Sequence, residues 1–261
     1  MAVLPSIPGL NISIIVDGKP ATEHKPLPEY FPPLIDVTGH QGIEHNKCHI
    51  KSEAGKPYAI RIRISPIFTF FCDEDTLIIS IYIDGKPFDN VIIPKRYIVS
   101  ATLDGKEYDE VISYCHRELS DGSSECYKPF FRDIRQPAYQ ADDDSGISDV
   151  ESIMTLGSIQ VAIEVAIETG PGLMRNDQFS DDKRNETLVI DNEALQSYGS
   201  GQIHATTYTR KDKTLDMGYI AVDSEAHIGN FFFYYQAPPA YRAEFNLQSK
   251  FEDRWANSMV R

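Results

Sequence analysis

Strict alternation of apolar and polar residues is the feature that most constrains the fold of this chain. In YAIRIRIS, residues 58–65, apolar side chains alternate with Arg61, Arg63 and Ser65. The segments LIISIYID from Leu77 and IQVAIEVAIE from Ile159 show a similar pattern. Because successive side chains of a strand point to opposite faces, a period of two predicts strands with one buried face. We therefore expect antiparallel sheets that cover a shared core.

Further strands and tight turns extend this interpretation to most of the chain. DGKP occurs at 17–20 and 84–87, and DGKE at 104–107; Asp-Gly supplies the positive φ angles of tight turns. The sequence predicts an all-β fold, an antiparallel β-sandwich that is jelly-roll-like or immunoglobulin-like, with long loops and a short C-terminal helix. The weaker strand candidates are NISIIVD from Asn11, RYIVSATL from Arg96, EVISYC from Glu110, ECYKPFF from Glu125, IHATTYTR from Ile203 and NFFFYYQ from Asn230.

The domain organisation has two interpretations. Residues 20–46, 137–156 and 169–200 are poor strand candidates, because they are rich in Pro, Gly, His or polar residues. We prefer a single extended β-sandwich domain over residues 1–261. The alternative is a main sandwich over 1–168 followed by a smaller C-terminal β unit over 200–261.

Charge and composition limit the classes of partner. The 261 residues carry 39 acidic and 25 basic side chains, a formal net charge of −14. Such a surface repels phosphate, so we expect no nucleic-acid partner. No apolar run approaches the roughly 20 residues of a membrane helix, and the N-terminus lacks the pattern of a signal peptide. We therefore expect a soluble protein in the cytoplasm or nucleus that does not bind membranes.

A cluster of imidazole and thiol groups is the sharpest chemical candidate. The stretch GHQGIEHNKCHIKSE contains His40, His45, Cys48 and His49. Zinc accepts both kinds of ligand, and distant residues such as His24, His116 or Asp36 would complete its shell. However, a strand over 48–52 turns Cys48 and His49 to opposite faces, so both cannot ligate one ion. We therefore expect no resident cofactor, with a zinc site that draws its ligands from His40, His45, Cys48 and His49 as the alternative.

Two other segments carry candidate binding or modification sites. The aromatic run at 231–235 is explained best as a central strand buried on both faces. If Phe232 and Tyr234 instead face outward, they form an aromatic binding surface. In ADDDSGISDVES, Ser145 and Ser148 lie among acidic residues, which is the context that acid-directed kinases favour. No assembled motif for nucleophilic or phosphate chemistry occurs.

The order of these motifs resembles a large fungal family of uncharacterised proteins, defined only as a domain of unknown function. The resemblance rests on the opening MAVLPSIPGL…VDGKP, then GKPYAIRIRI, ISIYIDGKPF and LGSIQVAIEVAI, and on the late GYIAVDSEAHIGNFFFYYQ. It implies a β-sandwich-like protein and brings no activity, cofactor or catalytic residue. It also gives the His-rich segment no support as a metal site.

The sequence therefore favours a non-enzymatic module that binds a protein partner or assembles with itself. Unpaired sheet edges need cover, which is the reason to expect a homo-oligomer. The alternative is a metal-binding protein or metal-dependent enzyme that uses the segment from His40 to His49.

Overall fold

The computed structural model describes residues 2–25, 36–40, 42–70, 73–118, 124–133, 155–172, 204–211 and 220–236. These residues form fourteen strands and one helix, arranged in three sheets. The prediction of an all-β, sandwich-like fold is confirmed. The segment predicted as a C-terminal helix lies outside the described residues.

A five-stranded antiparallel sheet forms one layer of the fold. Its order is β1-β2-β6-β9, with β3 paired to the far end of β2. The alternating segment at 58–64 becomes β6, the centre of this sheet, and it pairs with β2 on one side and β9 on the other. The strands are β1 (Ala2–Val3), β2 (Leu10–Val16), β3 (Lys19–Pro20), β6 (Tyr58–Ile64) and β9 (Tyr108–Ile112).

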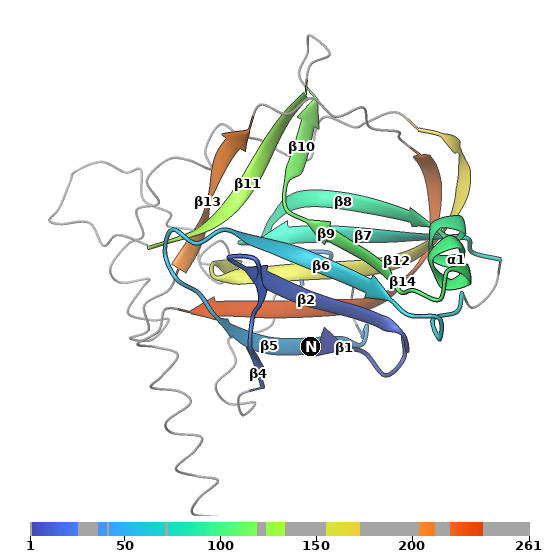
Figure 1. The fold of residues 1–261 in the computed structure, drawn as a ribbon, viewed down its shortest axis with the longest axis horizontal. Helices are drawn as coiled ribbons and strands as arrows, with labels where there is room; N and C mark the ends of the chain where they lie inside the picture. Colours follow the sequence, from blue (N-terminus) through green and yellow to red (C-terminus); the bar gives the residue numbers. More distant parts are fainter. Residues whose placement is uncertain are drawn as a thin grey trace, which may run out of the picture.

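A six-stranded sheet forms the second layer, and the five-stranded sheet crosses in front of it (Figure 1). Its order is β4-β5-β14-β12-β7-β8, and all its pairs are antiparallel except β5 with β14, which run parallel. The strands are β4 (Glu23–His24), β5 (His45–Lys51), β7 (Thr76–Ile83), β8 (Lys86–Pro94), β12 (Ser158–Pro171) and β14 (Ile220–Gln236).

The core lies between these two layers. The apolar faces of the alternating strands meet there, and burying each such side chain contributes roughly 1.5–3 kcal/mol. The fully buried members include Ile12, Ile14, Ile60, Ile62, Ile79, Ile163, Phe231 and Phe233. β14, which follows residue 169, lies in the middle of the second sheet between β5 and β12.

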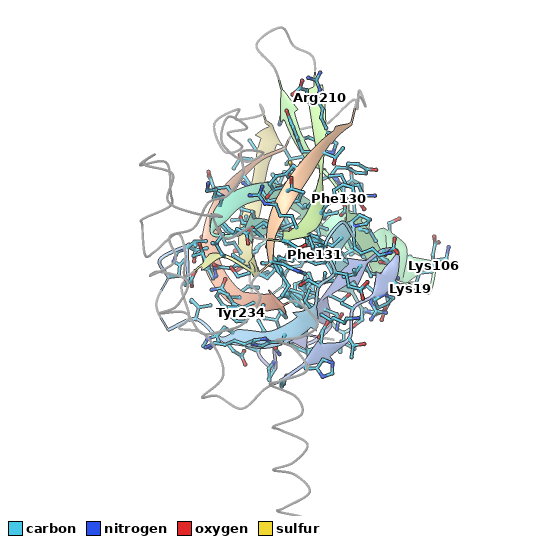
Figure 2. The ribbon with its side chains drawn as sticks, turned by 90° about the vertical axis from the view of Figure 1, so that its left-hand side faces the viewer. Lys19, Lys106, Phe130, Phe131, Arg210 and Tyr234 are labelled. Carbon is cyan, nitrogen blue, oxygen red and sulfur yellow. The ribbon has the colours of Figure 1, made fainter. Side chains whose placement is uncertain are left out.

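A three-stranded sheet, β10-β11-β13, rises from one end of the two layers (Figure 1). Its strands are β10 (Cys115–Glu118), β11 (Ser124–Asp133) and β13 (His204–Lys211). The Phe131 ring of β11 lies 4.4 Å from the ring of Tyr58 and 4.9 Å from that of Tyr235, centroid to centroid. Figure 2 shows Phe131 near the middle of the molecule and Arg210 toward the far end of this sheet. Aromatic packing therefore anchors the small sheet to the core.

The strand predicted from Arg96 is wrong, because these residues form helix α1 (Lys95–Leu103). The preceding strand β8 ends at Pro94, which pairs with Thr76, the first residue of β7. Beyond Pro94 the backbone N–H of Lys95 still donates to Asp75 O at 2.6 Å, but β7 itself begins at Thr76, so the ladder of paired residues ends here. Proline also has no N–H to donate to a sheet and is well accommodated at the start of a helix. The chain therefore leaves the sheet, and within α1 the buried residue is Ile98.

Candidate functional site on the outer face of the second sheet

The register of β5 and β14 brings the imidazole and aromatic candidates onto one face. His45 pairs with Asn230, and His49 pairs with Tyr234. Phe232 also pairs with Gln160 of β12. This outer face is opposite to the one that carries Phe231, Phe233 and Cys48 into the core. Distant segments of the sequence therefore supply one continuous surface.

Asp36 organises a hydrogen-bonded cluster on this face. Its Oδ1 accepts hydrogen bonds from Gln160 Nε2 at 2.6 Å and from the backbone N–H of Thr38 at 2.9 Å. Its Oδ2 accepts one from Asn230 Nδ2 at 2.8 Å. Burial by itself raises the pKa of Asp36, but the hydrogen bonds from Thr38 and Gln160 outweigh it and leave the pKa lowered. The carboxylate is thus held ionised.

An imidazole completes the cluster. His227 Nε2 lies 3.1 Å from Asn230 Oδ1, and the His227 ring lies 4.4 Å from that of His40. Because Asn230 donates its amide protons to Asp36, its Oδ1 must accept, and His227 is the donor. Burial, followed by the charge of His40, lowers the pKa of His227. A neutral imidazole, a carboxamide and a carboxylate therefore form a chain of hydrogen bonds.

The four predicted metal ligands are separated in the structure. The His45 ring meets Phe232 edge to face at 6.2 Å, and the His49 ring lies 5.5 Å from Tyr234. Cys48 faces the core, as the strand over 48–52 predicts, and burial raises the pKa of its thiol. Within the described ranges no group of three or more His, Cys, Asp or Glu side chains is arranged to hold a metal ion.

The aromatic surface proposed at Phe232 and Tyr234 has no exposed ring in this structure. Their exposed fractions are 2% and 6%, although both belong to the outer face. Figure 2 shows Tyr234 beside β5. The parallel pairing with β5 places His49 against its ring, and His45 covers Phe232. Ser145 and Ser148 lie outside the described residues.

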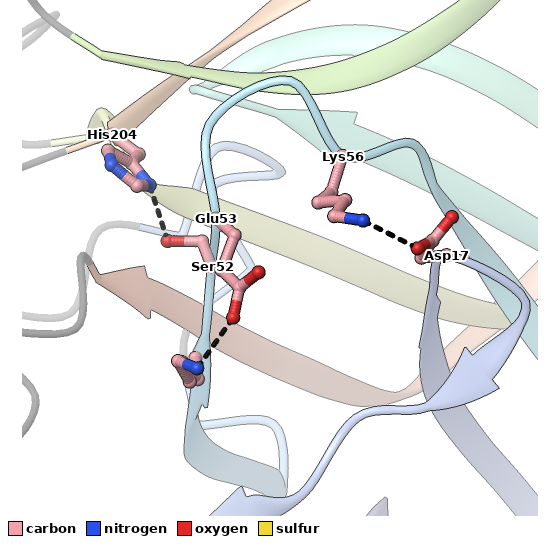
Figure 3. Close-up of polar contacts among 6 residues, drawn as sticks. Asp17, Ser52, Glu53, Lys56 and His204 are labelled. Carbon is pink, nitrogen blue, oxygen red and sulfur yellow. Dashed lines mark hydrogen bonds and ion pairs between the residues drawn. The ribbon is translucent and has the colours of Figure 1, made fainter.

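Sequence reasoning missed a Ser–His–Asp arrangement at the junction of two sheets, and Figure 3 shows the contact between its Ser52 and His204. Ser52 Oγ lies 2.8 Å from His204 Nδ1, and His204 Nε2 lies 2.9 Å from Asp133 Oδ1. Because Nε2–H donates to the carboxylate, Nδ1 accepts from the serine hydroxyl. Burial lowers the pKa of His204 although Asp133 opposes the shift. Three segments that are distant in sequence meet here, so no local sequence pattern could have predicted the contact.

The burial of these groups is the reverse of what a nucleophilic site needs. A reacting serine must reach its substrate, whereas its carboxylate partner is usually sheltered. Here Ser52 is fully buried and the Asp133 side chain is 71% exposed. The arrangement therefore ties the end of β5 to β11 and β13.

A second contact joins the hairpin of β10 and β11. Cys126 Sγ lies 3.1 Å from His116 Nδ1, because these residues face each other in the register. Cys115 is the sequence neighbour of His116, but neighbours on a strand point to opposite faces, so the contact is with Cys126 across the hairpin. Cys126 is fully buried.

The edge of the first sheet at β9 offers a different kind of site. Within the described ranges, β9 hydrogen-bonds to β6 on one side only. Val111 on this strand is 48% exposed, and Tyr97 and Leu103 on the adjacent helix α1 are also exposed. Apolar side chains and an open strand edge thus occur together.

The two layers, the small third sheet and helix α1 define an all-β protein of sandwich-like architecture. Its family model is described as a domain of unknown function (DUF7918) and matches residues 9–247. The chain belongs to this family, so the expected membership of an uncharacterised family is confirmed. No curated protein and no solved structure matches the chain. Among the described residues, no helix has the length and apolar character to span a membrane.

Proposed function

We propose that this chain is a protein-binding module that adds an extended, basic segment of a partner to the edge of β9. The observation that carries the proposal is that, among the described residues, β9 pairs with another strand on one side only. Val111, a residue of this strand, is exposed. In strand addition the main chain supplies the hydrogen bonds, and alternate side chains supply the specificity.

Charge favours a basic partner. Residues 104–110, DGKEYDE, contain four acidic side chains and one lysine, and the whole chain carries a net charge of −14. Arg61 offsets Asp109, and Arg63 lies 3.7 Å from Glu107. Asp104 and Glu110 add negative charge at the same edge. Complementary charge accelerates association and excludes acidic competitors.

The same charge argues against a second copy as the occupant. Two identical edges bring like charges together, which weakens self-pairing. Light scattering at micromolar concentration distinguishes the two cases, because edge-to-edge pairing of two copies doubles the mass. If the protein is a dimer and Val111→Lys dissociates it, the occupant of the β9 edge is a second copy of the chain and not a basic partner.

The direct test is selection of a displayed random-peptide library on the purified protein. We expect the selected peptides to be extended, with lysine or arginine alternating with apolar residues. Val111→Lys blocks the edge and repels basic segments, so it should reduce peptide affinity at least tenfold. Val111→Thr keeps the strand propensity and should cause a smaller loss.

The matched control is Ile67→Lys, which places the same charge at a site that is 67% exposed and outside the strands. It should leave peptide binding within twofold of the wild type. Equal losses in both lysine variants, or selected peptides without basic residues, would contradict the proposal.

A further inference from the structure

Two carboxylates on edge strands point into the space between the two layers. Asp89 on β8 lies opposite Ile81 of β7. Glu110 on β9 lies opposite Ile62 of β6. Directly opposite residues of an antiparallel pair project to the same face of the sheet, and both isoleucines belong to the core. Asp89 and Glu110 therefore face inward, and they come from different sheets.

The chain keeps these two edges on the same side of the molecule. β8 runs directly into α1, which leads to β9, and α1 contacts both strands. Burial raises the pKa of the Asp89 carboxyl to about 7, and the negative charge of Glu110 adds to this shift. The two carboxylates are thus close enough for one to act on the other.

Neither carboxylate is paired with a basic side chain in the described part of the chain. Asp89 Oδ1 accepts a hydrogen bond from the backbone N–H of Asn90 at 2.9 Å, and Glu110 Oε2 accepts one from the Tyr108 hydroxyl. By contrast, the outward-facing Asp109 is paired with an arginine of β6. Asp89 and Glu110 are both half-buried, so a group arriving from outside can reach them. Carboxylates that are partly removed from water are normally paired with a cation.

We propose that Asp89 and Glu110 together bind the guanidinium group of one arginine in the segment that adds to β9. This inference rests on the proposed function, because strand addition brings the arginine to the two carboxylates. The residue of the added strand opposite Glu110 points inward, with the two Cβ atoms about 4.5–5.5 Å apart. A guanidinium has five donors and is more weakly hydrated than an ammonium, so it suits a half-buried place between two carboxylates.

The register of the added strand also fixes the neighbours of this arginine. Residues two positions away on either side point inward beside Tyr108 and Ile112, so they should be apolar. The residues between them point outward beside Asp109 and Val111. The expected segment is therefore apolar–x–Arg–x–apolar, whereas strand addition by itself would accept basic residues on either face.

The probes are two capped heptapeptides that differ in one group. The first is acetyl-Thr-Val-Thr-Arg-Thr-Val-Thr-amide, and the second has citrulline, an uncharged isostere, in place of arginine. Calorimetry at pH 8, where Asp89 is ionised, measures both affinities. We expect the arginine peptide to bind at least tenfold tighter. Equal affinities would overturn the proposal, and they are the result expected if the two carboxylates only keep the strand edges from pairing.

Three variants test whether these two carboxylates set the preference for arginine. Asp89→Asn and Glu110→Gln should each reduce the preference at least threefold and leave the affinity of the citrulline peptide within twofold. The matched control is Asp109→Asn, which removes the same charge from the outward face of β9 and should leave the preference within twofold. A loss at Asp109 equal to that at Asp89 would overturn the proposal, because overall charge would then explain the preference.

Val111→Lys separates this inference from strand addition itself. It should weaken the binding of both peptides. If both peptides bind the wild type equally and Val111→Lys weakens both, only the arginine site is wrong. If the preference depends on Asp89 and Glu110 but Val111→Lys changes nothing, strand addition at β9 is wrong and the carboxylates still bind the guanidinium. If neither peptide binds the wild type, both proposals are overturned.

Discussion

The hydroxyl of Tyr235 donates a 2.5 Å hydrogen bond to Asp84 Oδ1, although the two residues are 151 positions apart. The backbone N–H of Gly157 donates to the same oxygen at 2.8 Å, and that of Thr206 donates to Oδ2 at 2.8 Å. One carboxylate therefore joins the turn between β7 and β8 to β14, to the start of β12 and to β13. Burial raises the pKa of Asp84, and these hydrogen bonds oppose the shift.

Replacing this carboxylate should destabilise the fold. Asn at position 84 keeps one acceptor and loses the other, so at least one of the three donors is left unpaired. We expect Asp84→Asn to reduce the free energy of unfolding by about 1–3 kcal/mol, measured by urea denaturation. Asn tolerates the positive φ of 51° at this position, so the backbone adds little to the loss.

The chain contains its own control for this experiment. Asp17 occupies the same place in the other DGKP turn, with a φ of 50°, and forms an exposed pair with Lys56 at 2.7 Å (Figure 3). Exposed pairs contribute little to stability. Asp17→Asn should therefore leave the unfolding midpoint nearly unchanged; equal losses at both positions would show that the turn, and not the buried network, sets the effect.

The glycines of the same two turns provide a second comparison. Gly18 and Gly85 have φ angles of +77° and +74°, so alanine is strained at both, by roughly 1–2 kcal/mol. A Cβ on Gly85 would also lie 2.6 Å from Thr155 Cβ, whereas a Cβ on Gly18 meets nothing within 4 Å. We expect Gly85→Ala to reduce the free energy of unfolding by about 2–5 kcal/mol in total. Gly18→Ala should reduce it only by the cost of the backbone strain. Thermal denaturation of the two variants measures the difference.

Asp89 should make the fold less stable as the pH rises. Burial raises its pKa to about 7. The folded state therefore binds this proton more tightly than the unfolded state, whose pKa is about 3.9. The stability that protonated Asp89 contributes is complete below about pH 4 and is lost as the pH rises through about 7.

The variant Asp89→Asn should remove this dependence. In the wild type the backbone N–H of Asn90 donates to Asp89 Oδ1 at 2.9 Å, and an Asn side chain keeps an acceptor for it. At pH 8 we expect the variant to be more stable than the wild type by on the order of 2 kcal/mol, and the difference should vanish near pH 4. Urea denaturation at both values measures it; a constant difference would contradict the assigned pKa.

Ser52 should contribute to stability through His204. Ser52→Ala leaves the buried Nδ1 of His204 without its 2.8 Å contact, and we expect a loss of about 1–2 kcal/mol. Asp133→Asn should have a much smaller effect because Asp133 is exposed. Guanidinium denaturation of both variants tests this order, and a larger loss at Asp133 would contradict it.

Zinc content tests the remaining metal hypothesis. Because His45 and His49 contact aromatic rings and Cys48 faces the core, we expect purified protein to contain well under one zinc per chain. His45→Ala should leave the value unchanged in elemental analysis. If the wild type contains stoichiometric zinc and His45→Ala loses it, the alternative of a metal-binding protein is supported instead.

Local pattern was sufficient for most strands and for both hairpin turns. Alternation predicted β6, β7 and β12, the weaker strand candidates included β2 and the second half of β14, and DG predicted the positive φ angles at 17–18 and 84–85. It failed at Arg96, because the end of β8 is set by where its neighbour β7 begins. It also missed the parallel pairing of β5 with β14, since the choice of neighbour is not encoded in either strand alone.

The sequence by itself determined most of the strands and which of their faces are apolar, because side-chain alternation follows from backbone geometry. Only the tertiary structure decided what the polar residues do. The two DGKP turns are identical in sequence, yet Asp17 faces solvent and Asp84 binds three distant donors. Likewise, Asn11 becomes part of a pocket only because β1 and β6 flank it. Such contacts depend on sheet order and register, which bring together residues that are far apart along the chain.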